Sequence, residues 1–119
     1  MSVAFISGHL DLTDAEFEAH YVPALDRAHA AGDTFIVGDA RGADFLAQRY
    51  LLARSANVVV HHMYTAPRNN AGFSTVGGFA SDEERDRWMT TNSDYDIAWT
   101  RPGRANSGTA RNLARRTNN

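Results

Sequence analysis

The chain has 119 residues, the size of one domain, and 43% of them are hydrophobic, enough for a core and too many for global disorder. The formal net charge is −2, so no overall field attracts nucleic acid or a membrane. Cysteine is absent, which excludes a disulfide framework, a zinc finger and a thiol nucleophile. The sequence shows no basic segment followed by a long apolar run, and this predicts a cytoplasmic protein without membrane partners.

The first third of the chain predicts a strand followed by a helix. Val3–Ile6 is a short apolar strand that ends at residues 7–9. Thr13 and Glu16 have the spacing of a capping box, and Pro23 predicts a kink or a restart of the helix near Tyr21. The apolar face of this helix consists of Phe17, Tyr21, Leu25 and Ala28.

The middle of the chain predicts two strands that flank a helix. The second strand is Thr34–Val37, and after a glycine-containing turn a helix runs to about Arg54. The third strand covers residues 57–64. Residues 66–80 contain one proline and three glycines without helical periodicity, so they are predicted to be a loop, either an active-site lid or a disordered excursion.

The last third predicts a helix, a strand and a second helix. Ser81 opens a helix that runs to about Thr91 and buries Trp88 and Met89, and residues 96–100 form a fourth strand. After a loop, Ser107 caps a helix that begins at Gly108 and ends near Arg116. Alternating strands and helices predict an α/β fold, a single Rossmann-like three-layer sandwich over residues 1–119 with about four parallel strands and helices on both faces.

The turn at residues 38–44 is the strongest candidate for a ligand site. Gly38 can adopt a positive φ where the strand ends, and Gly42 allows a phosphate to approach the start of the next helix. Arg41 offers a planar cation suited to phosphate or carboxylate. The alternative is an ordinary turn with Arg41 in solvent, because such turns are common in α/β domains.

Two further segments are expected at the same edge of the sheet. Residues 7–9 follow the first strand and residues 101–109 follow the fourth, and ligands of parallel sheets bind at the carboxyl ends of the strands. Three glycine-containing turns that meet there favour a nucleotide-like ligand with phosphates. His61 and His62 point to opposite faces of a strand and cannot chelate one ion, so no metal is expected.

Charged residues near the C-terminus suggest two other activities. Asp94 and Asp96 could do acid–base work or bind sugar hydroxyls, but solvated acids explain them equally well, and they lie at the opposite end of their strand. A basic segment without nearby acids could meet nucleic acid, although a solvated helix face explains it better. Its members are Arg101, Arg104, Arg111, Arg115 and Arg116.

Three motifs resemble those of the SLOG superfamily, the group of the SMF/DprA and Lonely Guy proteins: residues 6–9, residues 38–44 and Ser107-Gly108-Thr109. Nucleoside 2-deoxyribosyltransferases and deoxynucleotide N-glycosidases are similar to this group. The resemblance covers about residues 3–116 and implies a Rossmann-like sheet, a nucleotide-type ligand and a homo-oligomer. It implies no separate cofactor.

One position departs from the catalytic members of these families. Their catalytic glutamate lies three positions after the Gly-Thr pair, where this chain has Asn112, and an amide cannot act as a carboxylate. The Lonely Guy motif is also broken, because Arg104 stands in place of its second glycine. Turnover would need another carboxylate, and the weak candidates are Asp44, Asp94 and Asp96.

The sequence therefore favours a protein that binds a nucleotide-derived molecule without turnover. The alternatives are an N-glycosidase, deoxyribosyltransferase-like or phosphoribohydrolase enzyme, and a nucleic-acid-associated module. The residues expected to bind the ligand are Ser7, Gly8, His9, Gly38, Asp39, Ala40, Arg41, Gly42, Asp44, Arg101, Ser107, Gly108, Thr109 and Asn112.

Overall fold

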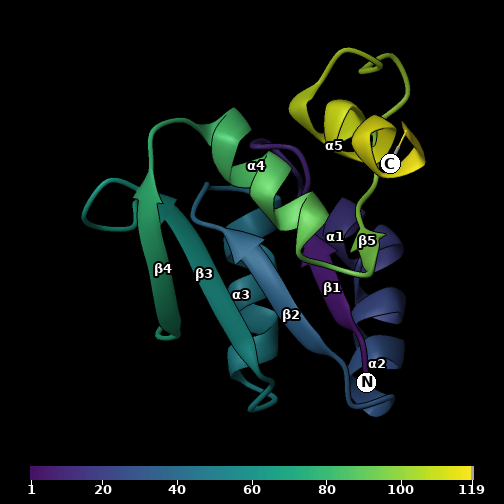
Figure 1. The fold of residues 1–119 in the computed structure, drawn as a ribbon. Helices are drawn as coiled ribbons and strands as arrows, with labels where there is room; N and C mark the ends of the chain where they lie inside the picture. Colours follow the sequence, from purple (N-terminus) through teal and green to yellow (C-terminus); the bar gives the residue numbers. More distant parts are fainter. Residues whose placement is uncertain (119) are drawn as a thin grey trace.

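The computed structural model describes residues 1–118 and is an α/β sandwich around one parallel sheet (Figure 1). The strands lie in the order β4-β3-β2-β1-β5. They are β1 (Val3–Ile6), β2 (Thr34–Gly38), β3 (Val58–Met63), β4 (Ser74–Phe79) and β5 (Tyr95–Ile97). The helices are α1 (Asp14–His20), α2 (Val22–Ala30), α3 (Ala43–Leu52), α4 (Asp82–Thr91) and α5 (Gly108–Asn118). Within residues 1–118, no helix is both long enough and apolar enough to cross a membrane.

The two faces of the sheet bury unequal amounts of apolar side chain. On one face, alternate residues of β1, β2 and β3 pack with α1, α2 and α3 in a large cluster that includes Ile6, Val37 and Val60. On the other face, the apolar cluster under α4 contains three buried residues, Phe5, Ile36 and Met89. The layer formed by α4 and α5 is therefore attached to the sheet largely through polar and charged side chains.

The break predicted at Pro23 is present. The helix ends at His20, and α2 begins at Val22 with the proline in its first turn, where a missing N–H breaks no helical hydrogen bond. The capping box of Thr13 and Glu16 is complete, with both reciprocal hydrogen bonds formed. All four side chains of the predicted apolar face are buried.

The hydroxyl of Tyr21 holds together the carboxyl ends of β1 and β5. It donates to the carbonyl oxygen of Ser7 at 2.6 Å and accepts from the N–H of Trp99 at 3.1 Å. Gly8 lies against the same ring, and a Cβ there would come within 2.3 Å of both the Tyr21 hydroxyl and the Cβ of Ala43. The segment after β1 can therefore pass this point only with glycine at position 8.

The predicted loop at residues 66–80 is wrong in its second half, because β4 occupies Ser74–Phe79 and gives the sheet five strands. This strand pairs in parallel with β3, with Val59 opposite Ser74. It carries no apolar alternation because it is an exposed edge strand with two glycines, so the usual strand pattern is missing. Two smaller predictions also change: β5 covers only Tyr95–Ile97, and Trp88 is 41% exposed while Met89 is fully buried.

Candidate functional site

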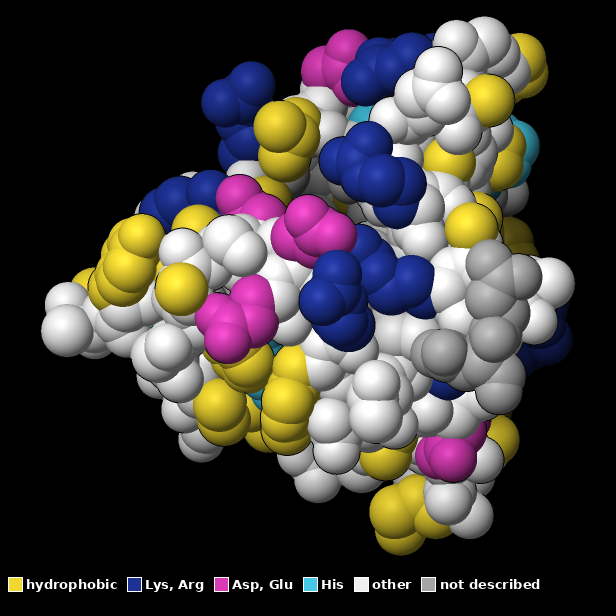
Figure 2. Space-filling view, turned by 45° about the horizontal axis from the view of Figure 1, so that its top comes forward, with side chains coloured by type: hydrophobic (Ala, Val, Ile, Leu, Met, Phe, Trp, Pro, Cys, Tyr) yellow, Lys and Arg dark blue, Asp and Glu magenta, His cyan; other side chains and the backbone are white. Residues whose placement is uncertain are grey.

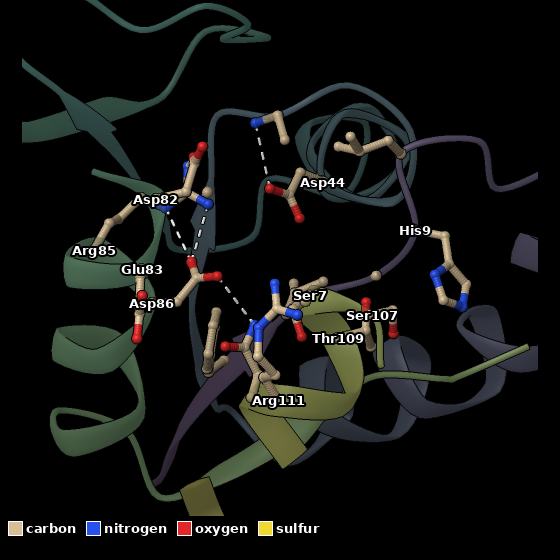
Figure 3. A pocket seen from close by; sticks show the side chains of 18 of the residues that line it. Ser7, His9, Asp44, Asp82, Glu83, Arg85, Asp86, Ser107, Thr109 and Arg111 are labelled. Atoms are coloured by element: carbon tan, nitrogen blue, oxygen red, sulfur yellow. Dashed lines mark hydrogen bonds and ion pairs between the residues drawn. The ribbon is translucent and has the colours of Figure 1, made fainter. Parts of the chain in front are cut away.

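A cavity of about 320 Å³ opens at the carboxyl edge of the sheet, between α4 and α5 (Figure 3). Its floor is formed by the ends of β1 and β2, and its two walls carry opposite charge. Figure 2, which turns this edge toward the reader, shows arginine and acidic side chains gathered next to each other. The lining residues are Phe5, Ile6, Ser7, Gly8, His9, Leu10, Gly38, Ala40, Asp44, Arg68, Asp82, Glu83, Arg85, Asp86, Arg104, Ser107, Gly108, Thr109, Arg111, Asn112 and Arg115.

All three predicted segments contribute to this cavity. The residues that sequence reasoning selected and that line it are Ser7, Gly8, His9, Gly38, Ala40, Asp44, Ser107, Gly108, Thr109 and Asn112. Four other selected residues lie outside it: Asp39, Arg41, Gly42 and Arg101. The convergence follows from topology, because the strands that precede these segments are parallel and adjacent.

Asp39 lies outside the cavity lining and forms buried ion pairs. Its side chain is 1% exposed, and it accepts hydrogen bonds from Arg85 Nη1 at 2.7 Å and Arg68 Nη2 at 2.8 Å. Burial by itself would raise the pKa of Asp39, but hydrogen bonds and charge from the two arginines outweigh it and lower the pKa. The carboxylate thereby joins the end of β2 to α4 and to the segment between β3 and β4.

The glycines of the central turn have different roles from those predicted. Gly38 does not have a positive φ; a Cβ there would come within 2.7 Å of Asp44 Oδ2 and 2.8 Å of Arg85 Cζ. Gly42 does have a positive φ, of 75°, and faces the chain itself, since its Cβ would lie 2.4 Å from the carbonyl oxygens of His9 and Leu10. Neighbouring residues of the protein, not a phosphate, occupy the space around these glycines.

Arg41, which the sequence predicts to bind the ligand, does not line the cavity. Arg41 is exposed and lies outside the cavity lining, so the turn presents it to solvent. α3 begins immediately after Gly42 and turns Asp44 inward, so Asp44 lines the cavity whereas Arg41 does not.

Three of the five C-terminal arginines, Arg101, Arg104 and Arg116, have acidic partners, contrary to expectation. Arg101 forms ion pairs with Glu16 at 2.7 Å and Asp11 at 3.2 Å. Arg116 pairs with Asp96 at 3.1 Å. These contacts take both arginines, and Asp96 with them, out of the candidate site.

Asp94 likewise stays away from the cavity. One of its carboxylate oxygens accepts from the N–H of Val3 at 2.7 Å, at the start of β1. The cavity lies at the other end of this strand, beyond Ile6. Of the three weak catalytic candidates, only Asp44 lines the cavity.

Sequence reasoning missed the acidic wall, which comes from α4. The α4 residues that line the cavity are Asp82, Glu83 and Asp86, together with Arg85, which pairs with two of these acids. An available signal was the charge pattern of this helix, which places one acid three residues before Arg85 and another one residue after it. An arginine with acids at both positions can be buried, because arginine is almost never fully buried unless it is paired.

Asp86 is the best-positioned carboxylate on this wall. Its Oδ1 accepts from Arg85 Nε at 3.0 Å and Nη2 at 2.9 Å, and its Oδ2 accepts from the side-chain amide of Asn112 at 3.2 Å. The other end of that amide accepts from Arg115. A carboxylate from α4 thus lies against Asn112, the α5 position at which the sequence resemblance led us to look for a glutamate.

Asp44 lies deeper in the cavity and is 6% exposed. Burial raises its pKa to about 7, and the nearby Arg85 guanidinium only partly opposes this effect. Its Oδ2 accepts from the N–H of Ala40 at 3.3 Å. Near neutral pH this side chain exists in both protonation states, so it can donate a proton or accept one.

The opposite side of the cavity presents hydrogen-bond donors. Ser107 Oγ caps the N–H of Ala110, and the amides of Gly108 and Thr109 at the start of α5 have no intrahelical acceptor. Ser7 is 7% exposed, and within residues 1–118 its Oγ has no hydrogen-bond partner. A buried hydroxyl without a partner in a cavity wall is expected to meet a ligand or an ordered water.

Comparison with known proteins found no match for this chain among family models, curated proteins or solved structures.

Proposed function

We propose that this chain binds a nucleotide or a nucleotide-derived small molecule in the cavity between α4 and α5 and holds it without turnover. The observation that carries the proposal is the unpartnered hydroxyl of Ser7, a residue that lines the same cavity as the start of α5. A helix start with free amides favours an anion, and a buried hydroxyl adds a directed hydrogen bond to it. Together they form a site for one phosphate.

The walls of the cavity match the rest of such a ligand. Arg104, Arg111 and Arg115 line the phosphate side. Across from them Asp86 Oδ2 accepts one hydrogen bond within the described residues, so it can accept another from a sugar hydroxyl. The volume of about 320 Å³ lies at the lower end of the range of about 300–1,000 Å³ for small-molecule sites, which suits a mononucleotide.

Replacing Arg111 with alanine is expected to weaken binding of a nucleoside monophosphate by about 10- to 100-fold, because one charge-assisted hydrogen bond is lost. Arg111 is exposed, and within residues 1–118 the one hydrogen bond of its guanidinium goes to the carbonyl oxygen of Asn106, so the fold should remain intact. The measurement is calorimetric titration with a panel of nucleotides. Arg41→Ala, which removes an arginine outside the cavity, is the matched control and should leave the affinity unchanged.

The same titration can test the phosphate contact and the sugar contact of the ligand independently. Asp86→Asn should weaken a ribonucleotide more than inorganic phosphate, because it alters the hydroxyl contact in addition to the contacts of Asp86 with Arg85 and Asn112. Equal losses for Arg41→Ala and Arg111→Ala, or no binding by any phosphate-bearing compound, would contradict the proposed site.

An N-glycosidase is the second candidate, and Asp44 is the observation that favours it. A protonated carboxyl in the cavity can donate a proton to a leaving base while the bond between the base and the sugar breaks. Water would then add to the sugar carbon and give its proton to a carboxylate, for which Asp86 is positioned. The missing glutamate at Asn112 speaks against efficient turnover.

We expect no release of base from ordinary ribo- or deoxyribonucleoside monophosphates, measured by chromatography over hours. The assay is run beside Asn112→Glu, which restores the family's carboxylate, and beside Asp44→Asn and Asp94→Asn. Robust release that Asp44→Asn abolishes and Asp94→Asn leaves unchanged would establish the enzyme and refute the binding-only proposal.

We further propose that the chain forms a homo-oligomer and works in the cytoplasm. The first proposal rests on the exposed apolar side chains of the fold, among them Trp88. The second rests on the absence of cysteine.

A further inference from the structure

Asp44 is the acid of the cavity that has no arginine partner within residues 1–118. The acidic residues of the lining are Asp44, Asp82, Glu83 and Asp86. Asp82 pairs with Arg85 at 3.1 Å, and Asp86 pairs with the same guanidinium at 2.9 Å. Glu83 pairs with Arg87 at 3.0 Å. Asp44 is 6% exposed and forms no ion pair in the described part of the chain, which leaves a buried carboxyl without a compensating charge.

The start of α3 places Asp44 against the segment that carries Ser7. The N–H of Ala43 donates to the carbonyl oxygen of His9 at 3.1 Å, and a Cβ on Gly8 would come within 2.3 Å of the Cβ of Ala43. Ser7 and Asp44 each adjoin a residue of this contact, and both line the cavity. In Figure 3 both residues border the space between α4 and α5. An anion held by the Ser7 hydroxyl would therefore share a small cavity with this carboxyl.

The charges around Asp44 do not stabilise its ionised form. Arg85 is a nearby cation, but its Nη1 donates to Asp39 at 2.7 Å and its Nη2 to Asp86 at 2.9 Å. Burial is the largest cause that raises the pKa of Asp44, and the charges of Asp86 and Asp39 add to it. The Tyr21 hydroxyl, near Asp44, stays uncharged because burial raises its pKa as well. Besides the acids, the charged or titratable residues of the lining are His9, Arg68, Arg85, Arg104, Arg111 and Arg115.

We propose that Asp44 contributes to the site as the neutral acid and donates a hydrogen bond to an oxygen of the phosphate, so that binding of the anion takes up a proton. The inference rests on the proposed phosphate site. When the ligand enters as a dianion, the Asp44 carboxylate gains a proton from water or buffer and one O–H bond forms, while the phosphate keeps its charge. Two like charges that share one buried site cannot both stay ionised, so the anion and the Asp44 carboxylate exclude each other.

The affinity for a phosphate monoester should then fall about tenfold for each pH unit above 7, because binding consumes one proton. The pKa of Asp44 in the free protein is about 7, so above that pH the free site carries a charge that binding must neutralise. A phosphate monoester is already a dianion there, since its second pKa is about 6. Burial lowers the pKa of His9, and arginine keeps its charge. Among the residues that line the cavity, Asp44 is thus the group that titrates between pH 7 and pH 9.

The test is calorimetric titration with adenosine 5′-monophosphate at pH 7, 8 and 9, in two buffers that differ in their heat of protonation. The unmodified protein should take up close to one proton per ligand at pH 9. Asp44→Asn keeps a hydrogen-bond donor but has no charge to neutralise, so its affinity should be constant across this range and about 100-fold above that of the unmodified protein at pH 9. Asp82→Asn removes an acid of the same cavity that is paired with arginine, and it should keep the tenfold change per pH unit.

The outcomes separate this inference from the proposed function. If neither adenosine 5′-monophosphate nor inorganic phosphate binds at any pH, both are refuted. If the nucleotide binds with the same affinity at pH 7 and pH 9, or if Asp44→Asn takes up the same number of protons, the role of Asp44 alone is refuted. An affinity that rises with pH would also refute it, because Asp44 would then accept a hydrogen bond from the ligand as a carboxylate.

Discussion

Replacing Asp39 with alanine is expected to lower the free energy of unfolding at pH 7 by about 3–5 kcal/mol, the range for removing one partner of a buried ion pair. The arginine left behind, Arg85, is 5% exposed and would keep its charge without its shortest carboxylate contact in the interior. Chemical denaturation followed by circular dichroism measures the change. A decrease below about 1 kcal/mol would show that the remaining acids replace Asp39.

The control and the pH dependence make this result specific. Asp82 touches the same two arginines but is 55% exposed, so Asp82→Ala should decrease stability by less than about 1 kcal/mol. The pKa of Asp39 is lowered in the folded state, so its contribution is present above the unfolded pKa and is lost as the pH falls through the folded pKa. The difference between Asp39→Ala and the unmodified protein should therefore shrink in acid.

Replacing Asp44 with asparagine is expected to have the opposite effect and to stabilise the protein above pH 7 by about 2–4 kcal/mol, since each pKa unit corresponds to about 1.4 kcal/mol. Burial raises the pKa of this carboxyl from 3.8 to about 7. Between these values the folded state binds more protons than the unfolded state, so stability falls as the pH rises. The amide carries no charge and avoids this loss.

Denaturation at pH 4 and pH 8 checks the prediction, because the stabilisation should be near zero at the lower pH and full at the higher. Asp14→Asn, at an exposed position on α1, should change stability by less than about 0.5 kcal/mol at both. A gain that does not vary with pH would refute the ionisation argument. A stabilised Asp44→Asn variant that also binds ligand less tightly would indicate that the carboxyl is retained for function.

The elements with clear apolar periodicity were predictable from the sequence, and those without it were not. The strand Val3–Ile6 and the break at Pro23 follow from local chemistry, and both are confirmed. The edge strand β4 escaped prediction because it lies mostly in solvent and its two glycines carry no pattern. Its existence depends on hydrogen bonds to β3, which are a property of the folded chain.

The candidate site, too, was predictable from the sequence only in part. Strand-end segments such as residues 7–9 could be assigned to one edge because parallel topology brings strand ends together. The direction in which each side chain points could not be assigned: Arg41 and Asp39 are close in sequence to Asp44, yet only Asp44 lines the cavity. Asp86 was missed because its role depends on the packing of α4 against α5, which no local pattern encodes.

The unequal burial on the two faces of the sheet predicts that amide protons will exchange with solvent at unequal rates. The face of α1, α2 and α3 carries the large apolar cluster, whereas α4 rests on Phe5, Ile36 and Met89 and on ion pairs such as that of Arg85. Segments with fewer buried apolar contacts open at a free energy below that of global unfolding. The wall of the cavity is then the part of the molecule that opens first, and a bound ligand would slow exchange in α4 and α5 far more than in the helices behind the sheet.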